Sequence, residues 1–446
     1  MPTWKSFAKP AAPALAAALL TSSLAGCGTG DPGRGAPPLD THRDVTVYTW
    51  WSTGSENEGL ITLVEVFRQQ HPEIDFVDDG ITGGGGGSAK EHLQSRLETQ
   101  DPPDTFVAHA GAELDDYIAD GYIQDVSALY DAYGWTDVFP AELIDLLATE
   151  DGKIYSVPSN IHRANVMWVN PAVLREHGLD PSGRYDTLDA FIADLAALRE
   201  GGVEVPLALG TTWTQVHLLE TVLLGGLGHE AYSGLWDGTT DWNGPEVTAV
   251  LEDFRTILGY STPTRMDHDW DHAIGKVADG ESAFNIMGDW AVSGFGNAGK
   301  TFGEDYLAVP SPGSHGVFDF LADSFTMSTG ILDEQDAEAW LQTIGSKEAQ
   351  IRFNKVKGAI PARTDIDENQ FTAYQKTAIA SFQKDTIVSS MAHGAAIPVG
   401  HLTDITSATT AFNKQVLDGG GDVAAFQKAL AEAASKAGAA TATAGP

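Results

Sequence analysis

One stretch near the start of the chain constrains its fold more than any other. Residues 45–50 alternate β-branched and aromatic side chains, a pattern typical of a β-strand. A Ser-Thr-Gly-Ser turn follows, and apolar side chains then recur at three- and four-residue spacing from Leu60 to Phe67, which indicates one face of a helix. The sequence therefore predicts an α/β fold, in which a ligand usually binds at the carboxyl ends of the strands.

Trp50 and Trp51 stand where that strand is expected to end, and Glu56 and Glu58 follow the turn. Adjacent tryptophans are as often core residues as binding residues, because an indole is amphipathic and often half buried. The polar turn and the two carboxylates favour a sugar site, since an indole covers the apolar face of a pyranose and carboxylates bind its hydroxyls. We expect replacement of Trp51 by alanine to weaken binding without unfolding the protein.

The first residues have the features of an export signal. Residues 1–10 carry Lys5 and Lys9 and no acid, and the apolar run 11–25 is too short to span a bilayer comfortably. The run ends in Leu-Ala-Gly-Cys at 24–27, which resembles a bacterial lipobox, in which Cys27 receives a lipid and becomes the mature N-terminus. Because Cys27 is the only cysteine of the chain, a chance match is disfavoured, and no disulfide can stabilise the fold.

This signal sets the expected location of the protein. We expect residues 1–26 to be a lipoprotein signal peptide and residues 27–43, rich in Gly and Pro, to be a flexible tether. The globular part would then be extracytoplasmic, held at the outer face of the cytoplasmic membrane by the lipid on Cys27 alone.

The charge of the chain narrows the class of ligand. The 62 acidic residues outnumber the 26 basic ones, which gives a formal net charge of −36. Such a field repels nucleic acid and anionic lipid surfaces, so a neutral ligand is the easiest fit.

The rest of the chain continues the α/β alternation. Residues 105–109 are expected to form a strand that ends on His109, and the following Ala-Gly pair lets backbone approach closely. Residues 155–170 form a long extended stretch that we expect to cross from one lobe to another. A helix is expected at 212–224, within a helix-rich second lobe.

Two stretches partly match phosphate-binding or metal-binding motifs, but each lacks a required part. The glycine run 83–87 lacks the Gly-Lys-Ser/Thr ending of a phosphate-binding loop. His268 and His272 have the i, i+4 spacing of metal ligands on a helix, but no clear third ligand accompanies them. We expect neither a metal nor a cofactor.

Taken together, several motifs carry a resemblance to a known family. These motifs are Tyr-Thr-Trp-Trp at 48–51, Asp-Pro-Pro-Asp-Thr-Phe-Val-Ala-His-Ala-Gly at 101–111, Ser-Val-Pro-Ser-Asn-Ile-His-Arg-Ala-Asn at 156–165, Phe-Asn-Ile-Met-Gly-Asp-Trp at 284–290, Asp-Ser-Phe at 323–325, Gly-Ser-Lys-Glu-Ala-Gln at 345–350, Lys-Gly-Ala-Ile-Pro-Ala-Arg at 357–363 and His-Gly at 393–394. In these motifs the chain resembles, from Val45 onward, the extracellular solute-binding proteins of sugar ABC transporters (family 1), close to the glucose/mannose-type branch and related to maltodextrin-binding proteins.

The resemblance implies an α/β, two-lobed periplasmic-binding-protein fold (type II, Venus-flytrap) with three interlobe crossovers. Residues 44–160 and 316–360 would form the first lobe, and residues 161–315 and 361–446, including a C-terminal tail, the second. A small sugar, glucose or a related aldohexose, would bind between the lobes, close them, and be delivered by this monomer to an ABC permease. The implied sugar contacts are Trp50, Trp51, Glu56 or Glu58, Lys90, His109, Trp270, Asp289, Asp323 and His393.

Alternatives remain open at this stage. Asp289 could cap a helix, Asp323 could bridge backbone at a hinge, and His393 could only tighten a turn. A secreted carbohydrate-active enzyme with paired carboxylates is a rival function, although no motif isolates such a pair. A surface sugar sensor or adhesin that binds without transport is a second rival, and the sequence leaves the identity of the sugar open.

Overall fold

The computed structural model describes residues 43–52, 54–81 and 87–443. Cys27 and the glycine run 83–87, apart from Gly87, lie outside these residues. Among the described helices, none is both long and apolar enough to cross a bilayer.

The first lobe is built on a five-stranded sheet in the order β2-β1-β3-β11-β4. β1 pairs in parallel with β2 and β3, whereas β11 runs antiparallel to β3 and β4. The predicted strand at 105–109 is present as β3, which ends on His109. The strands span Arg43–Tyr48 (β1), Ile74–Asp78 (β2), Thr105–His109 (β3), Ser156–Pro158 (β4) and Asp323–Thr326 (β11).

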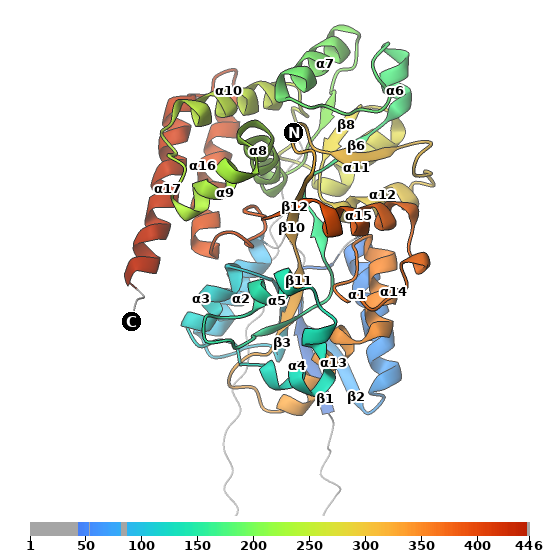
Figure 1. Cartoon of the computed structure of the whole chain (residues 1–446), viewed down its shortest axis with the longest axis vertical. Helices are drawn as coiled ribbons and strands as arrows, with labels where there is room; N and C mark the ends of the chain where they lie inside the picture. Colours follow the sequence, from blue (N-terminus) through green and yellow to red (C-terminus); the bar gives the residue numbers. More distant parts are fainter. Residues whose placement is uncertain (1–42, 53, 82–86, 444–446) are drawn as a thin grey trace, which may run out of the picture. The chain divides into compact units, whose positions relative to one another are not determined.

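Helices cover this sheet. α1 packs along α14 and α13, and α3 contacts β3 (Figure 1). The helices of this lobe span Gly54–Gln70 (α1), Gly87–Glu98 (α2), Glu113–Ala119 (α3), Ser127–Tyr133 (α4), Trp135–Asp137 (η2), Ala141–Leu147 (α5), Glu334–Gly345 (α13) and Lys347–Lys357 (α14).

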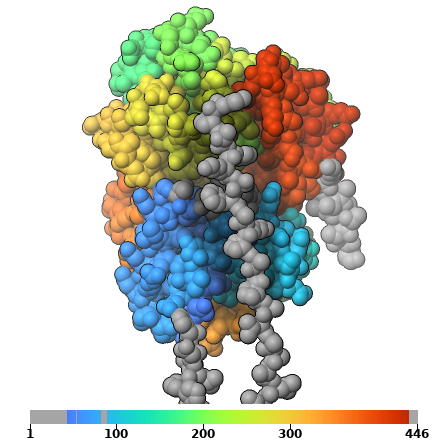
Figure 2. All heavy atoms as spheres, turned by 180° about the vertical axis from the view of Figure 1, so that it is seen from behind, coloured from blue at the N-terminus to red at the C-terminus, as the bar shows by residue number. Residues whose placement is uncertain are grey.

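The second lobe holds a four-stranded sheet in the order β7-β8-β6-β9. Its strands span Val166–Val169 (β6), Leu207–Ala208 (β7), Phe284–Ile286 (β8) and Leu307–Pro310 (β9). Its helices span Pro171–Glu176 (α6), Leu188–Glu200 (α7), Thr212–Leu227 (α8), His229–Asp237 (α9), Pro245–Gly259 (α10), Trp270–Asp279 (α11), Asp289–Ala291 (η3), Val292–Asn297 (α12), Val399–Leu417 (α16) and Val423–Thr443 (α17). The C-terminal pair α16 and α17 packs on α10. In the space-filling view these red helices lie with the green and yellow residues of the second lobe, whereas the blue residues of β1, α1 and β2 lie in the first lobe (Figure 2).

A third sheet, in the order β12-β10-β5, joins the two lobes. Its strands span His162–Arg163 (β5), Val317–Leu321 (β10) and Thr386–Ser389 (β12), and the nearby segment holds Glu368–Gln370 (η4) and Ala373–Lys384 (α15). β5 lies between β4 and β6 in the chain, and β10 lies between β9 and β11, so the chain crosses between the lobes in these strands. The two-lobed fold with crossovers is confirmed.

The long extended stretch predicted at 155–170 is divided into β4, β5 and β6. An asparagine side chain forms hydrogen bonds at each of the two breaks between these strands. The Asn160 side chain accepts the N–H of Asp323 at 2.8 Å, and the Asn165 amide donates to the carbonyl of Val317 at 2.9 Å. Because these side chains satisfy backbone groups of the neighbouring strands, the stretch can leave one sheet and enter the next.

The buried apolar side chains form two clusters. Val47, Phe106 and Phe325 of the first sheet pack with Trp340 of α13 in one cluster of buried side chains. A second cluster contains Leu219, Phe254 and Phe284 together with Phe426 of α17. The first cluster also contains Trp168 of β6 and Trp270 of α11, so apolar packing continues from the first lobe into the second.

Candidate functional site

Three strand ends of the first lobe meet at one edge of its sheet. Trp50 follows β1, His109 ends β3 and Asp323 begins β11, directly opposite His109 in the antiparallel register. The carboxyl ends of parallel strands lie at the same edge of a sheet, so the fold brings these three residues together.

Side chains from the second lobe and the crossing strands complete a hollow at this edge. Its empty volume is about 410 Å³, which includes open solvent at the mouth. The lining residues are Trp50, Glu56, His109, His162, Trp213, Trp270, Trp290, Leu321, Asp323, Lys357 and His393.

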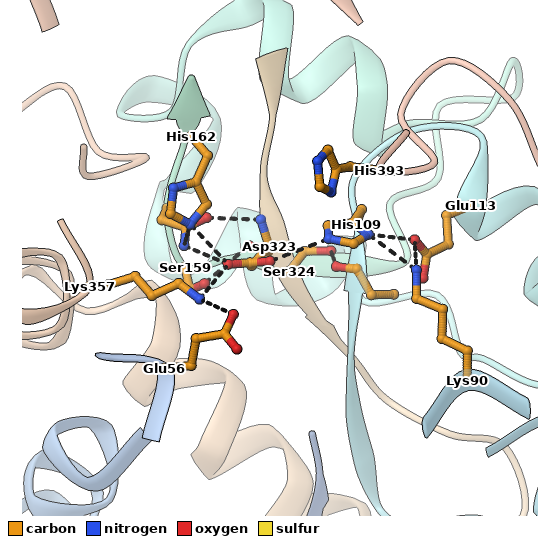
Figure 3. Close-up of polar contacts among 12 residues, drawn as sticks. Glu56, Lys90, His109, Glu113, Ser159, His162, Asp323, Ser324, Lys357 and His393 are labelled. Atoms are coloured by element: carbon orange, nitrogen blue, oxygen red, sulfur yellow. Dashed lines mark hydrogen bonds and ion pairs between the residues drawn. The ribbon is translucent and has the colours of Figure 1, made fainter. Parts of the chain in front are cut away.

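Asp323 is the polar centre of this cavity (Figure 3). Its Oδ2 accepts the Asn160 amide at 2.7 Å and lies 3.4 Å from His162 Nε2 and 3.8 Å from Lys357 Nζ. His109 Nε2 lies 3.6 Å from Oδ1. Burial alone would raise the pKa of Asp323, but Lys357, His162 and His109 lower it below its usual range, so this carboxylate stays ionised.

Lys357 reaches the cavity because α14 ends there. Gly358 adopts φ +88°, a left-handed conformation that favours glycine, and its N–H bonds the Asn354 carbonyl. The Lys357 ammonium then lies 2.9 Å from Glu56 Oε1, with only 2% of its side chain exposed. One buried cation therefore serves two carboxylates, those of Glu56 and Asp323.

His109 is held from behind by a second ion pair. Its Nδ1 lies 2.6 Å from Glu113 Oε2, and Lys90 donates to the same oxygen at 2.7 Å. Burial would raise the pKa of Glu113, but Lys90 and His109 outweigh this effect and lower it to about 2. Glu113 is therefore a carboxylate that fixes the orientation of the His109 ring.

His162 bridges two acids. Its Nδ1 bonds Asp289 Oδ1 and its Nε2 faces Asp323. Burial opposes a charge on this imidazole, but Asp289 and Asp323 raise its pKa, which favours the form with protons on both ring nitrogens.

Four indoles supply apolar walls. Trp213 and Trp290 lie 6.3 Å apart between ring centroids, and Trp50 lies 5.3 Å from His109. Asp269 orients the Trp213 ring, whose Nε1–H donates to its Oδ1 at 2.8 Å, and the same oxygen caps α11 by accepting the Trp270 backbone N–H at 2.8 Å. Aromatic faces beside ionised carboxylates and a lysine suit a ligand with both apolar faces and hydroxyls.

Six of the residues expected from the sequence line this cavity: Trp50, Glu56, His109, Trp270, Asp323 and His393. Trp51 lies behind the wall with 1% of its surface exposed, stacked on Phe353 at 5.3 Å between centroids. Glu58 is exposed on α1.

Lys90 and Asp289 also stand outside the lining. Lys90 contacts His109 and Glu113 and lines a neighbouring hollow instead. Asp289 is fully buried, where it accepts the Arg163 N–H at 3.1 Å as well as binding His162. Each of them therefore positions a residue that lines the cavity. Lys90 positions His109, and Asp289 positions His162.

Five lining residues are not among the contacts expected from the sequence: His162, Trp213, Trp290, Leu321 and Lys357. Three of them lie within the motifs at 156–165, 284–290 and 357–363. These motifs mark the segments but do not assign a binding role to these three residues. Trp213 lies at the start of a predicted helix, and no local pattern marks it. His268 and His272 are exposed neighbours with ring centroids 4.2 Å apart, and no third metal ligand joins them among the described residues.

Comparison with known proteins agrees with this architecture. The chain is 34% identical over 401 residues to an uncharacterized ABC transporter extracellular-binding protein of Pyrococcus horikoshii, covering 88% of this chain and 89% of the relative. It is 30% identical to a probable sugar-binding periplasmic protein of Mesorhizobium japonicum, covering 80% and 85% of the two chains.

A solved structure shows the same fold. The bacterial solute receptor AcbH, described as having an exclusive preference for β-D-galactopyranose, superposes with a TM-score of 0.74 at 17% identity, covering 89% of this chain and 99% of the receptor. Residues 63–389 match the family model of the bacterial extracellular solute-binding proteins. The chain therefore belongs to the bacterial extracellular solute-binding protein family.

Proposed function

We propose that the chain is the sugar-binding receptor of an ABC importer, which captures glucose or a related aldohexose between its lobes and delivers it to the permease. The observation that carries this proposal is the cavity at the junction of the lobes, where tryptophans stand beside Asp323, Glu56 and Lys357. Stacking on the indoles would hold the apolar face of the sugar, and the charged groups would bind its hydroxyls. A sugar-binding relative at 30% identity supports the same class of ligand.

The charge states in the cavity favour binding over catalysis. A glycosidase needs one carboxylic acid whose pKa is raised so that it can donate a proton. Here the neighbouring cation and imidazoles lower the pKa of Asp323, and Glu56 pairs with Lys357. We therefore propose reversible capture with no chemical step, by a monomer. Turnover of a chromogenic glycoside would contradict this proposal.

The location of the protein is part of the proposal. Lipidation of Cys27 would hold the chain at the outer face of the cytoplasmic membrane, with residues 1–26 removed and residues 27–43 as a tether. The lobes would comprise residues 44–160 with 316–360 and residues 161–315 with 361–446. A Cys27→Ala variant is expected to leave the membrane fraction, and retention there would contradict the anchor.

Calorimetry on a soluble form starting at Asp40, refolded to remove carried-over ligand, tests the substrate. Glucose, galactose, mannose, maltose and xylose form the panel, and saturable binding of one hexose at micromolar or tighter affinity is expected. Loss of uptake on deletion of the gene would separate transport from a surface sensor or adhesin.

A further inference from the structure

A buried polar row on α8 lies directly behind the cavity. Trp213, His217 and Glu220 are spaced by four and three residues, so they share one face of the helix. Trp213 lines the cavity, whereas His217 and Glu220 are fully buried and belong to no motif discussed above.

His217 makes one short contact, with a cavity residue. Its Nδ1 lies 2.9 Å from Nε2 of His393, and the two ring centroids are 5.2 Å apart. Burial lowers the pKa of His217 to about 4. Burial also lowers the pKa of His393 well below its usual value, and the neighbouring His217, His109, Lys90 and His162 add to this effect. Both rings are therefore neutral near pH 7, and a single proton lies between these two nitrogens.

The surroundings of His217 decide which nitrogen carries that proton. Its Nε2 is buried without a partner at hydrogen-bond distance among the described residues. The carbonyl of Ala164 is the backbone acceptor that acts on this ring, and Nδ1 already faces His393. A proton on Nε2 is attracted by the carbonyl, whereas a lone pair there would be repelled. His217 is then an acceptor at Nδ1, and His393 donates its Nε2–H.

The segment that carries His393 is held in place by the same helix. Glu220 accepts the N–H groups of Met391 and Ala392 and the hydroxyl of Ser390. Its carboxylate also accepts the Tyr232 hydroxyl at 2.8 Å. With Nε2 bound to His217 and the backbone fixed, Nδ1 is the nitrogen of His393 that is left for a ligand.

We propose that His217 is a positioning residue that fixes the tautomer of His393, so that His393 offers the cavity a hydrogen-bond acceptor. This inference rests on the proposed function, because it names how the sugar site chooses among ligands. A sugar hydroxyl that donates to Nδ1 of His393 is required at one position of the ring. An analogue that cannot donate at that position leaves the nitrogen unpaired.

The cluster has a second chemical interpretation, as a metal site. His217, Glu220 and His393 each place a ligand atom within 4.8 Å of the others. The two imidazoles, however, already bond each other, and Glu220 already accepts hydrogen bonds from four groups. A metal would have to break these bonds, so the hydrogen-bonded chain is the better assignment.

The tautomers are measured directly by two-bond ¹H–¹⁵N correlation spectra of the full-length, ¹⁵N-histidine-labelled protein without ligand. The expected spectrum shows His393 protonated at Nε2 and bare at Nδ1, with His217 protonated at Nε2. Protonation of His393 at Nδ1 overturns the proposal, and so does a shift of these signals on adding Zn²⁺ at equal concentration. Because this spectrum needs no sugar, it stands apart from any failure of the proposed function.

Variants and analogues test the consequence for binding. His217→Asn keeps an acceptor near Nδ1 and is expected to keep the tautomer, whereas His217→Leu removes it. With glucose as the probe, deoxy and deoxyfluoro analogues at the position facing His393 are both expected to bind wild type about tenfold or more weakly, since neither can donate. In His217→Leu this penalty should shrink at that one position and persist at the others. An equal loss of affinity for every analogue would show a structural role only and overturn the proposal.

Discussion

The ammonium of Lys357 lies 4.7 Å from the centroid of the Trp51 ring. Trp51 therefore acts as the floor under a buried cation, and it stacks on Phe353 and meets Phe325 edge to face. The cation in turn holds Glu56 and faces Asp323. The second tryptophan of the pair thus supports the site from within the core, while Trp50 reaches the cavity itself.

This position changes the expected effect of the Trp51→Ala substitution. Removing a buried indole leaves a cavity in the core, which costs about 3–5 kcal/mol in comparable cases. We expect the free energy of unfolding, measured by urea denaturation, to fall by that amount. Trp50→Ala serves as the matched variant and should weaken sugar binding with a smaller loss of stability. Equal stability of the two variants would contradict the assigned positions.

Glu56 and Glu58 form a natural pair for testing the site, because they are two residues apart on α1. Glu56 lines the cavity and binds Lys357, whereas Glu58 is exposed. We expect Glu56→Gln to weaken sugar binding about 10- to 100-fold, since hydrogen bonds to charged groups contribute roughly 1.5–3 kcal/mol. Glu58→Gln should leave calorimetric affinity unchanged. A comparable loss in both variants would remove the Glu56–Lys357 pair from the site.

The lowered pKa of Glu113 makes the free energy of unfolding depend on pH below about pH 4.5. The pKa of Glu113 is about 2 in the folded chain against an ordinary value of 4.5, so its contribution is present above pH 4.5 and is lost as the pH falls toward 2. The full contribution is about 3 kcal/mol. Glu113→Gln should therefore be destabilised at pH 7, and its stability should fall less than that of wild type between pH 4.5 and pH 2. Parallel pH profiles of Glu113→Gln and wild type would refute this prediction, and Glu58→Gln is the control that should follow wild type.

Substitution of Gly111 by alanine tests how closely the chain packs against the segment that carries His393. Its φ is +111°, and a Cβ there would lie 2.5 Å from the carbonyl oxygen of Ala395. Gly121, at φ +72°, has open space around the same position. Both alanine variants carry the strain of a left-handed conformation, of order 1–3 kcal/mol. Only Gly111→Ala should also weaken sugar binding, because the clash displaces the segment that carries His393.

The sequence predicts the parts of the site that depend on local pattern. A strand that alternates and then stops locates Trp50, and the same argument locates His109 at the end of β3. Alternation places Trp50 and Trp51 on opposite faces, but it cannot say which face is the core, because that depends on α14 and its Phe353. Lys357 and Trp213 come from helix ends far away in the sequence, and only the packing of the lobes brings them to Asp323.

The central claim is that a sugar binds in the cavity around Asp323. The most direct test is calorimetric titration of the five sugars into wild type and Asp323→Asn side by side, with circular dichroism to check that both are folded. The account predicts that one hexose binds wild type with micromolar or tighter affinity and binds Asp323→Asn about 100-fold more weakly, since the carboxylate's charged hydrogen bonds are lost. If no sugar binds the folded wild type, or if one binds both proteins equally, the site is not the one described.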